Sequence, residues 1–220
     1  MWNTLPIARK LGFLVVPGLL FLSVRTMAKP LTPTAFVKKE TRKVRTILKR
    51  RPRKNTRAYQ RKKDDLRNEV DSLIDFKLLA KRSLRDFWDK LKEDKRDKFV
   101  RLLKDLVQES YMSRIDENPN FKMIYKEEKK LSSGKAIVRS VAKKGKTEVE
   151  IAFKLIPKDN SWIVYDMVID DVSVERNYRR QFKKIINKHG FDGLLEKMEN
   201  KLKELRNGKK AAKPGKGDDL

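Results

Sequence analysis

Apolar residues recur every three or four positions through the first half of this 220-residue chain, a spacing that predicts amphipathic helices. A first helix is expected to run up to Leu48, because Pro52 disfavours helix at the residue before it. A second helical region is expected from Leu66 to Trp88. The clearest apolar stripe follows Glu93 and consists of Phe99, Leu102, Leu103, Leu106, Val107 and Tyr111.

After Asn118-Pro119-Asn120 the apolar residues alternate with polar ones, and this alternation predicts strands rather than helices. Gly145 and the polar run at residues 157–160 mark turns. The strands are expected at residues 121–130, 135–143, 149–155 and 162–169. Short turns between successive strands imply an antiparallel sheet.

Helical spacing returns near the C-terminus, first from Tyr178 to Ile186 and then, after Gly190, from Leu194 to Leu205. The last residues, 208–220, are rich in Lys, Gly and Pro and are expected to be disordered. Helices, then strands, then helices predict one α+β domain, in which a curved antiparallel sheet is covered by helices.

The first 28 residues have the pattern of a secretory signal peptide. Arg9 and Lys10 precede an apolar run of 14 residues, 11–24, and Thr26-Met27-Ala28 offers small residues for cleavage. Fourteen residues are too few for a comfortable membrane-spanning helix. Arg25, just after the run, leaves an uncleaved anchor as the alternative. Export favours membranes over nucleic acid as the partner.

The formal net charge is +26, and half of it lies between residues 35 and 63, where 14 Lys and Arg face the single acid Glu40. We interpret residues 29–63 as a basic N-terminal arm or helix and residues 64–207 as the domain proper. Two interpretations of the arm remain open: a flexible solvated segment, or a patch that docks on anionic lipid headgroups or on an acidic partner.

Candidates for catalysis are few, and we expect neither an enzyme nor a metal site or cofactor. The chain has no Cys and one His, His189, which precedes Gly190 at an expected helix end, where a cation is favourable. Asp166, Asp170 and Asp171 could supply paired carboxylates, since Asp166 and Asp170 would share a face of the strand. Capping of the following helix is the expected role of Asp170 and Asp171.

Two blocks of residues together form a recognisable pattern. The first block is Ser83-Leu84-Arg85-Asp86-Phe87-Trp88 with Lys95-Arg96-Asp97-Lys98-Phe99 and Tyr111. The second, more specific block is Trp162-Ile163-Val164-Tyr165-Asp166-Met167-Val168-Ile169-Asp170-Asp171-Val172-Ser173, followed by Asn177-Tyr178-Arg179 and Phe182. This pattern resembles that of the MlaC/toluene-tolerance family, although Arg85 and Asp171 stand where the family usually has Gly. The first segment is also far more basic than is typical of the family.

The resemblance implies a periplasmic phospholipid carrier of an ABC-type transport system that serves outer-membrane lipid asymmetry. Its partners would be an inner-membrane transporter complex and an outer-membrane lipoprotein complex. The basic charge of the chain, rather than the resemblance, adds transient contact with anionic membranes to the expected partners. The phospholipid is cargo rather than a cofactor. Its acyl chains would lie in an internal cavity between sheet and helices, with the headgroup in solvent and weak headgroup selectivity.

The apolar faces supply candidate lipid-binding residues, although the same side chains could fill a solid core. Arg179 could pair with a phosphate at the mouth of the cavity, or form a structural salt bridge. Tyr178 could line that mouth or pack in the core. The candidate lipid-binding residues are Leu73, Phe76, Trp88, Phe99, Leu103, Leu106, Tyr111, Val138, Val149, Ile151, Phe153, Tyr165, Met167, Ile169, Tyr178 and Phe182.

Two other functions compete with lipid transport. A nucleic-acid-binding protein would use the basic residues between Arg42 and Lys63, although the signal-like N-terminus disfavours it. A scaffold would dock on membranes through the same arm and carry no cargo.

Overall fold

The computed structural model describes residues 31–117 and 120–208, with the backbone alone for residues 111–117. The expected signal peptide at 1–28 and all but the first residue of the expected tail lie outside the described residues. The helices are α1 (Pro33–Leu48), α2 (Arg57–Leu73), α3 (Phe76–Leu84), the short 3-10 helix η1 (Arg85–Lys90), α4 (Glu93–Glu117) and α5 (Val174–Arg206). The strands are β1 (Lys122–Lys130), β2 (Ala136–Lys144), β3 (Thr147–Lys158), β4 (Ser161–Ile169) and β5 (Val172–Ser173).

The starts of four helices follow from local side-chain capping. Thr32, Thr56, Asp75 and Ser173 each precede a helix, and each side chain accepts a hydrogen bond from the backbone N–H three residues later. Such caps satisfy N–H groups that have no partner inside the helix. The helix beginnings are therefore encoded in the sequence immediately before them.

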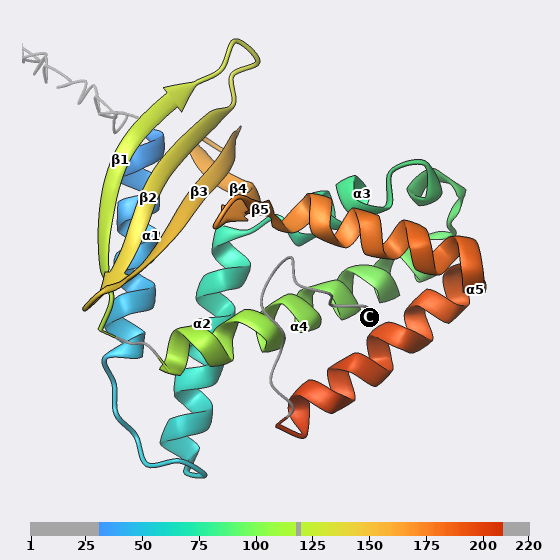
Figure 1. Cartoon of the computed structure of the whole chain (residues 1–220), viewed down its shortest axis with the longest axis horizontal. Coiled ribbons are helices and arrows are strands. Elements are labelled where there is room, and N and C mark those ends of the chain that lie inside the picture. The colour runs from blue at the N-terminus through green and yellow to red at the C-terminus, as the bar shows by residue number, and fades with distance from the viewer. Residues whose placement is uncertain (1–30, 118–119, 209–220) are drawn as a thin grey trace, which may run out of the picture.

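The strands form one antiparallel sheet in the order β1-β2-β3-β4-β5, so each strand pairs with its neighbours along the chain. Two β-bulges interrupt the pairing, one at Lys126 in β1 and one at Tyr165 in β4. An extra residue in one strand bends that strand and increases its twist. The bulges are consistent with the curvature of the sheet in Figure 1. The predicted α+β class with a curved antiparallel sheet and covering helices is confirmed.

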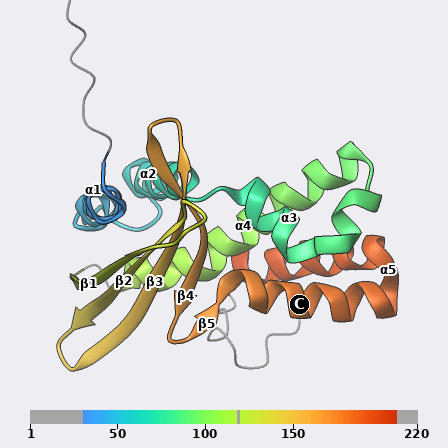
Figure 2. The same cartoon turned by 90° about the horizontal axis from the view of Figure 1, so that it is seen from above.

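The apolar interior falls into clusters at different places in the fold. Seen from above, α1, α2 and the sheet lie at one end, α3 and α5 extend to the other, and α4 runs from one end to the other (Figure 2). The helical core is built by α3, η1, α4 and α5. The sheet core is built by Phe36 and Val37 of α1, Leu73 of α2, and the inner face of β2, β3 and β4. A smaller cluster joins α1 to α2.

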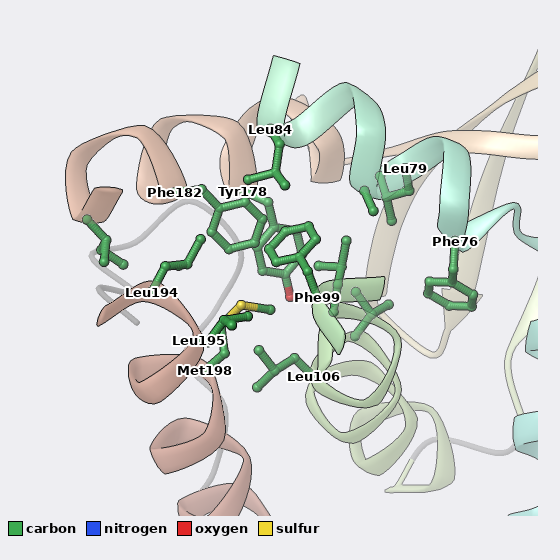
Figure 3. Packing of buried hydrophobic residues seen from close by; sticks show 14 of the residues in the cluster. Phe76, Leu79, Leu84, Phe99, Leu106, Tyr178, Phe182, Leu194, Leu195 and Met198 are labelled. Atoms are coloured by element: carbon green, nitrogen blue, oxygen red, sulfur yellow. The ribbon is translucent and has the colours of Figure 1, made fainter. Parts of the chain in front are cut away.

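Side chains of the helical core point toward one another from α3, α4 and both halves of α5 (Figure 3). Phe99 meets Phe182 edge-on with ring centroids 5.2 Å apart, and Tyr178 stacks on Phe182 at 5.3 Å. The second half of α5 returns to this core because Gly190 breaks the helix with φ 72° and ψ 178°. That conformation is open almost only to glycine.

The segment interpreted as a basic arm differs from the expectation. Phe36 is 6% exposed and Val37 is fully buried in the sheet core. The side chain of Glu128 also accepts a hydrogen bond from the backbone of Thr34 at 2.9 Å, which ties the start of α1 to β1. A flexible arm over residues 35–48 is therefore wrong, because one face of α1 is an apolar layer of the fold. The expected domain boundary at residue 64 also falls inside α2.

The expected capping by Asp170 and Asp171 is also wrong. Both residues lie in the turn between β4 and β5, with φ values of 44° and 65°. Asp170 accepts a hydrogen bond from the backbone N–H of Glu150 at 3.0 Å. Ser173 is the residue that caps α5. The two-residue strand β5, too short to produce a pattern, separates the aspartates from the helix.

The two positions where the family resemblance expects Gly adopt left-handed backbone conformations. Arg85, which follows α3 and begins η1, has φ 50° and ψ −120°, and Asp171 has φ 65°. Glycine accepts positive φ without strain, whereas a side chain is disfavoured there. Asp tolerates the left-handed region better than Arg does. The backbone thus explains why glycine suits these positions.

Candidate functional site

The boundary between the helical core and the sheet core, here called the seam, is the candidate site. Ile74 at the end of α2 and Met167 on β4 contact both cores. Val70 and Ile169 pack against the helical core, and Ile151 packs against the sheet core. All five side chains are apolar and only partly buried. The seam therefore holds apolar surface that the fold itself does not fully cover.

Polar contacts between α2 and α4 frame the seam on its helical side. Gln108, itself buried, donates to Asp71 at 2.6 Å, and Lys104 pairs with the same carboxylate. Arg67 pairs with Glu109 at 2.6 Å. These contacts fix α2 against α4, so Val70 and Ile74 are held on a rigid support.

A buried carboxylate joins the sheet to α5. The side chain of Asp166 has no exposed surface, and it accepts three hydrogen bonds: from Lys154 Nζ at 2.9 Å, Ser173 Oγ at 2.8 Å and the backbone N–H of Glu175 at 3.0 Å. A buried charge is tolerated when it is paired and hydrogen-bonded in this way. Negative charge at the start of α5 is also favourable. Asp166 thus has a structural role that accounts for its burial.

A second charged group lies around Glu175 in the first turn of α5. Its carboxylate pairs with Arg82 Nη2 at 3.3 Å and with Arg179 Nη1 at 3.2 Å. The Arg82 guanidinium also lies 4.8 Å from the ring centre of Tyr165. Burial raises the pKa of the Tyr165 hydroxyl, and the positive charge of Arg82 opposes that rise. Of the two interpretations of Arg179, the structure contains the salt bridge.

The candidate lipid-binding residues separate into groups by their packing. Buried members of the helical core are Phe76, Trp88, Phe99, Leu103, Leu106, Tyr178 and Phe182, and buried members of the sheet core are Leu73, Val138 and Phe153. Their mutual packing explains their burial without a ligand. Tyr165 is buried outside both cores. Contact of these residues with a lipid stays a prediction.

The remaining candidates lie nearer to the seam or outside the described side chains. Met167, Ile151 and Ile169 belong to the seam, and Val149 is partly buried two residues before Ile151 on β3. The backbone of Tyr111 lies in α4, and its side chain is outside the described residues. Sequence reasoning missed Val70 and Ile74, although their spacing of four on one helix face was the available signal.

The described residues hold no group of three or more His, Asp and Glu side chains placed to bind a metal ion. Within the same part of the chain, none of the helices has an apolar stretch long enough to cross a bilayer. His189 is exposed at the end of the first half of α5, where the sequence placed it.

Similarity to known proteins agrees with this architecture. The MlaC protein of Haemophilus influenzae, named as an intermembrane phospholipid transport system binding protein, is 25% identical over 139 residues. That match spans 61% of this chain and 65% of the relative, which is slightly less than two thirds of the relative's length. A phospholipid-binding protein from Ralstonia solanacearum, solved in complex with a phospholipid, has the same fold with a TM-score of 0.71. It is 22% identical, and the match covers 78% of this chain and 97% of that protein.

The model of the family described as MlaC protein matches residues 38–200, most of the chain, from within α1 to within the last part of α5. This chain therefore belongs to the MlaC protein family.

Proposed function

We propose that this chain is a periplasmic phospholipid carrier that moves lipid between an inner-membrane transporter complex and an outer-membrane complex. The family match over residues 38–200 carries the proposal. It is supported by the phospholipid transport role for which the Haemophilus influenzae relative is named and by the phospholipid bound to the Ralstonia solanacearum protein of the same fold. The proposal involves binding and release and no chemical step.

The seam is the part of the fold best suited to hold acyl chains. Exposing about 30 methylene groups to water costs on the order of 20 kcal/mol at about 0.8 kcal/mol each. A carrier must therefore cover most of that surface with its own apolar side chains. Side chains that are already fully enclosed gain little from a ligand, whereas Ile74, Ile151 and Met167 still have apolar surface to cover. We place the lipid tails along these residues.

The headgroup is proposed to lie in solvent, with little selection between headgroups. Arg179 pairs with Glu175 at 3.2 Å, and Arg82 pairs with the same carboxylate. A phosphate would have to compete with Glu175 for either guanidinium. The affinity should therefore come from the tails, and the headgroup should contribute little.

Native mass spectrometry of protein purified from cells without detergent tests the proposal. The expected result is about one phospholipid per chain. Ile151→Glu and Met167→Glu should each lower that occupancy, because a carboxylate at the seam would be buried against hydrocarbon. Ile137→Glu is the matched control: Ile137 is also partly buried, and it lies on β2 next to Val138, on the opposite face of the sheet.

Lipid-free wild-type protein after gentle purification would contradict the proposal. Equal loss of lipid in Ile137→Glu and in the seam variants would contradict the position of the site. Circular dichroism should give the same helical signal for all three variants, which separates loss of binding from loss of folding.

The periplasmic location depends on residues 1–28 acting as a signal peptide. A reporter that is active only after export, fused behind residue 30, should be active in cells. The same reporter fused to a chain that begins at residue 29 should be inactive. Activity of both fusions, or of neither, would contradict export by this segment.

A further inference from the structure

The loop between α1 and α2, with the first turns of α2, is the most positively charged stretch of the described chain. Residues 49–63, here called the basic loop, contain nine Lys and Arg and no Asp or Glu. Figure 1 shows this connection at one extremity of the molecule, beyond the sheet and apart from α3 and α5. Most of its residues are exposed. Lipid transport through the seam does not use it.

Part of this charge has a structural explanation. Arg50 forms an ion pair with Asp65. Arg51 donates to the carbonyl oxygen of Leu48 at 2.8 Å, which satisfies the end of α1. Lys62 is buried. These three side chains support the fold of the hairpin.

Of the six remaining cations, Lys49 lies at the C-terminal end of α1, where positive charge is favourable, and Lys63 is partly buried. The other four cations of the basic loop have no such explanation. Arg53, Lys54, Arg57 and Arg61 are exposed, and none of them forms an ion pair within the part of the chain that the structure describes. Arg57 lies in the first turn of α2, which contains no acidic residue. Positive side chains near a helix N-terminus are unfavourable. Folding alone therefore does not account for these four residues.

We propose that the basic loop docks this protein on the anionic surface of a phospholipid bilayer. This inference rests on the proposed function, since a lipid carrier has to approach membranes. Arginine guanidinium groups match phosphate oxygens in pairs, and Arg53, Arg57 and Arg61 are free to do so. Because α2 has 17 residues, at about 1.5 Å per residue its other end, at the seam, lies about 25 Å from the loop.

The composition of the loop favours a bilayer over nucleic acid. Proteins that hold single strands combine basic grooves with several aromatic side chains on which bases stack. The only aromatic residue among residues 49–63 is Tyr59, which is partly buried. The loop thus offers charge without a stacking platform, and this suits a surface of phosphate headgroups.

Vesicle co-sedimentation with the full-length chain tests the inference. The probes are vesicles of phosphatidylglycerol mixed with phosphatidylcholine and vesicles of phosphatidylcholine alone, and the readout is the difference in binding between the two. The quadruple variant Arg53→Gln, Lys54→Gln, Arg57→Gln, Arg61→Gln removes the four unexplained cations. The control changes four exposed lysines elsewhere: Lys146→Gln, Lys183→Gln, Lys188→Gln and Lys203→Gln. Both variants have a net charge of +22, from 26 − 4.

The loop variant should bind the anionic vesicles on the order of several hundredfold more weakly, at about fivefold for each basic residue near the surface. The control should lose much less. Added salt should weaken wild-type binding to the anionic vesicles, because exposed charges are screened. The apolar run at residues 11–24 should contribute equally to binding of both vesicle types. Its contribution therefore cancels when binding to phosphatidylcholine vesicles is subtracted from binding to the anionic vesicles.

Equal losses in the loop variant and the control would overturn the docking inference. A loop variant that lost binding to a short DNA duplex but kept its binding to anionic vesicles would overturn it in favour of nucleic acid. Native mass spectrometry of the same variants keeps the two proposals apart. A loop variant that keeps its lipid occupancy but no longer docks on anionic vesicles supports the docking inference. Wild-type protein that carries no lipid but still docks contradicts the carrier function and leaves the docking inference intact.

Discussion

The helical core and the seam are built from the same kinds of side chain but differ in how completely they are enclosed. Phe99, Phe182 and Leu194 are fully buried in the helical core and meet residues from several helices. Ile151 and Met167 at the seam are only partly buried. The comparison separates apolar residues that hold the fold together from apolar residues that still have surface to cover.

This difference assigns two roles that a hydrophobic pattern alone does not separate. Removing a side chain from a close-packed core leaves a cavity and costs stability. Removing one from the seam costs less stability, and the proposed function requires that it alter lipid binding. Substitutions in the two regions test that division.

Phe182→Ala should lower the free energy of unfolding by about 3–5 kcal/mol, because it removes a fully buried ring that contacts Phe99 and Tyr178. Chemical denaturation at neutral pH measures the change. Folded Phe182→Ala should still bind lipid. A variant that kept its stability and lost its lipid would reverse the assignment of core and seam.

Asp166→Asn should cost about 2–3 kcal/mol, because the hydrogen bonds from Lys154, Ser173 and Glu175 lose their charged acceptor. This residue connects the sheet to α5 and so links the two regions under comparison. Asp170→Asn is the control, since Asp170 is exposed and its side chain holds one backbone N–H. If denaturation showed the same loss of unfolding free energy in both variants, the burial of Asp166 would add nothing to its contribution to stability.

Arg85→Gly should raise the stability of the helical region by about 1–2 kcal/mol, because φ 50° with ψ −120° is strained for a side chain and relaxed for glycine. Asp171→Gly should gain less, since Asp tolerates its φ of 65°. Thermal denaturation of the two variants side by side checks the order. Destabilisation by Arg85→Gly would mean that the Arg85 side chain makes contacts that outweigh the strain.

Met167→Ala should cost only about 1 kcal/mol of stability, because the side chain is only partly buried. Lipid occupancy measured by native mass spectrometry should fall more clearly than stability does. Leu103→Ala, in the helical core, should do the opposite: it should lose much stability and have little direct effect on lipid occupancy. If the two variants lost stability and lipid occupancy in the same proportion, the distinction between core and seam would be removed.

The smallest effect concerns the charged side chains of Glu40 on α1 and Glu69 on α2, which lie away from both regions. Burial, and then a hydrogen bond with Glu40, raise the pKa of the Glu69 carboxyl. A raised carboxyl pKa in the folded state means that stability falls as the pH rises from about 4.5 through the folded value. Glu69→Gln should flatten the stability curve in that window. If the free energy of unfolding of Glu69→Gln had the same dependence on pH as that of the wild type, Glu69 would be excluded as the cause of this dependence.

Much of the fold could be predicted from the sequence because its elements have strong local signals. The stripe after Glu93, the turn at Gly145 and the interruption at Gly190 all lie where the pattern placed them. The packing of α1 was not predicted because the many Lys and Arg residues of this segment favoured a solvated arm, although Phe36 and Val37 form a short apolar face. Charge describes the exposed side of a helix and says little about the side that is buried.

The candidate site was harder to predict than the fold. Ile151 and Phe153 lie two positions apart on the same face of β3, yet Phe153 is 4% exposed and Ile151 only partly buried. Phe153 belongs to the sheet core with Phe36 and Val37 of α1. Degree of burial therefore depends on partners more than 100 positions away, and periodicity within one strand contains no information about them.

The hydrogen bonds around Asp166 have a consequence for recognising related chains. Asp166, Ser173, Tyr178 and Phe182 form the spacing by which this chain resembles its family, and in the structure each has a contact within the protein itself. A search for that spacing therefore identifies chains with this fold and does not distinguish which lipid a chain binds. Under the proposed function, a preference for one lipid over another is expected to come from side chains outside that spacing, such as Ile151 at the seam.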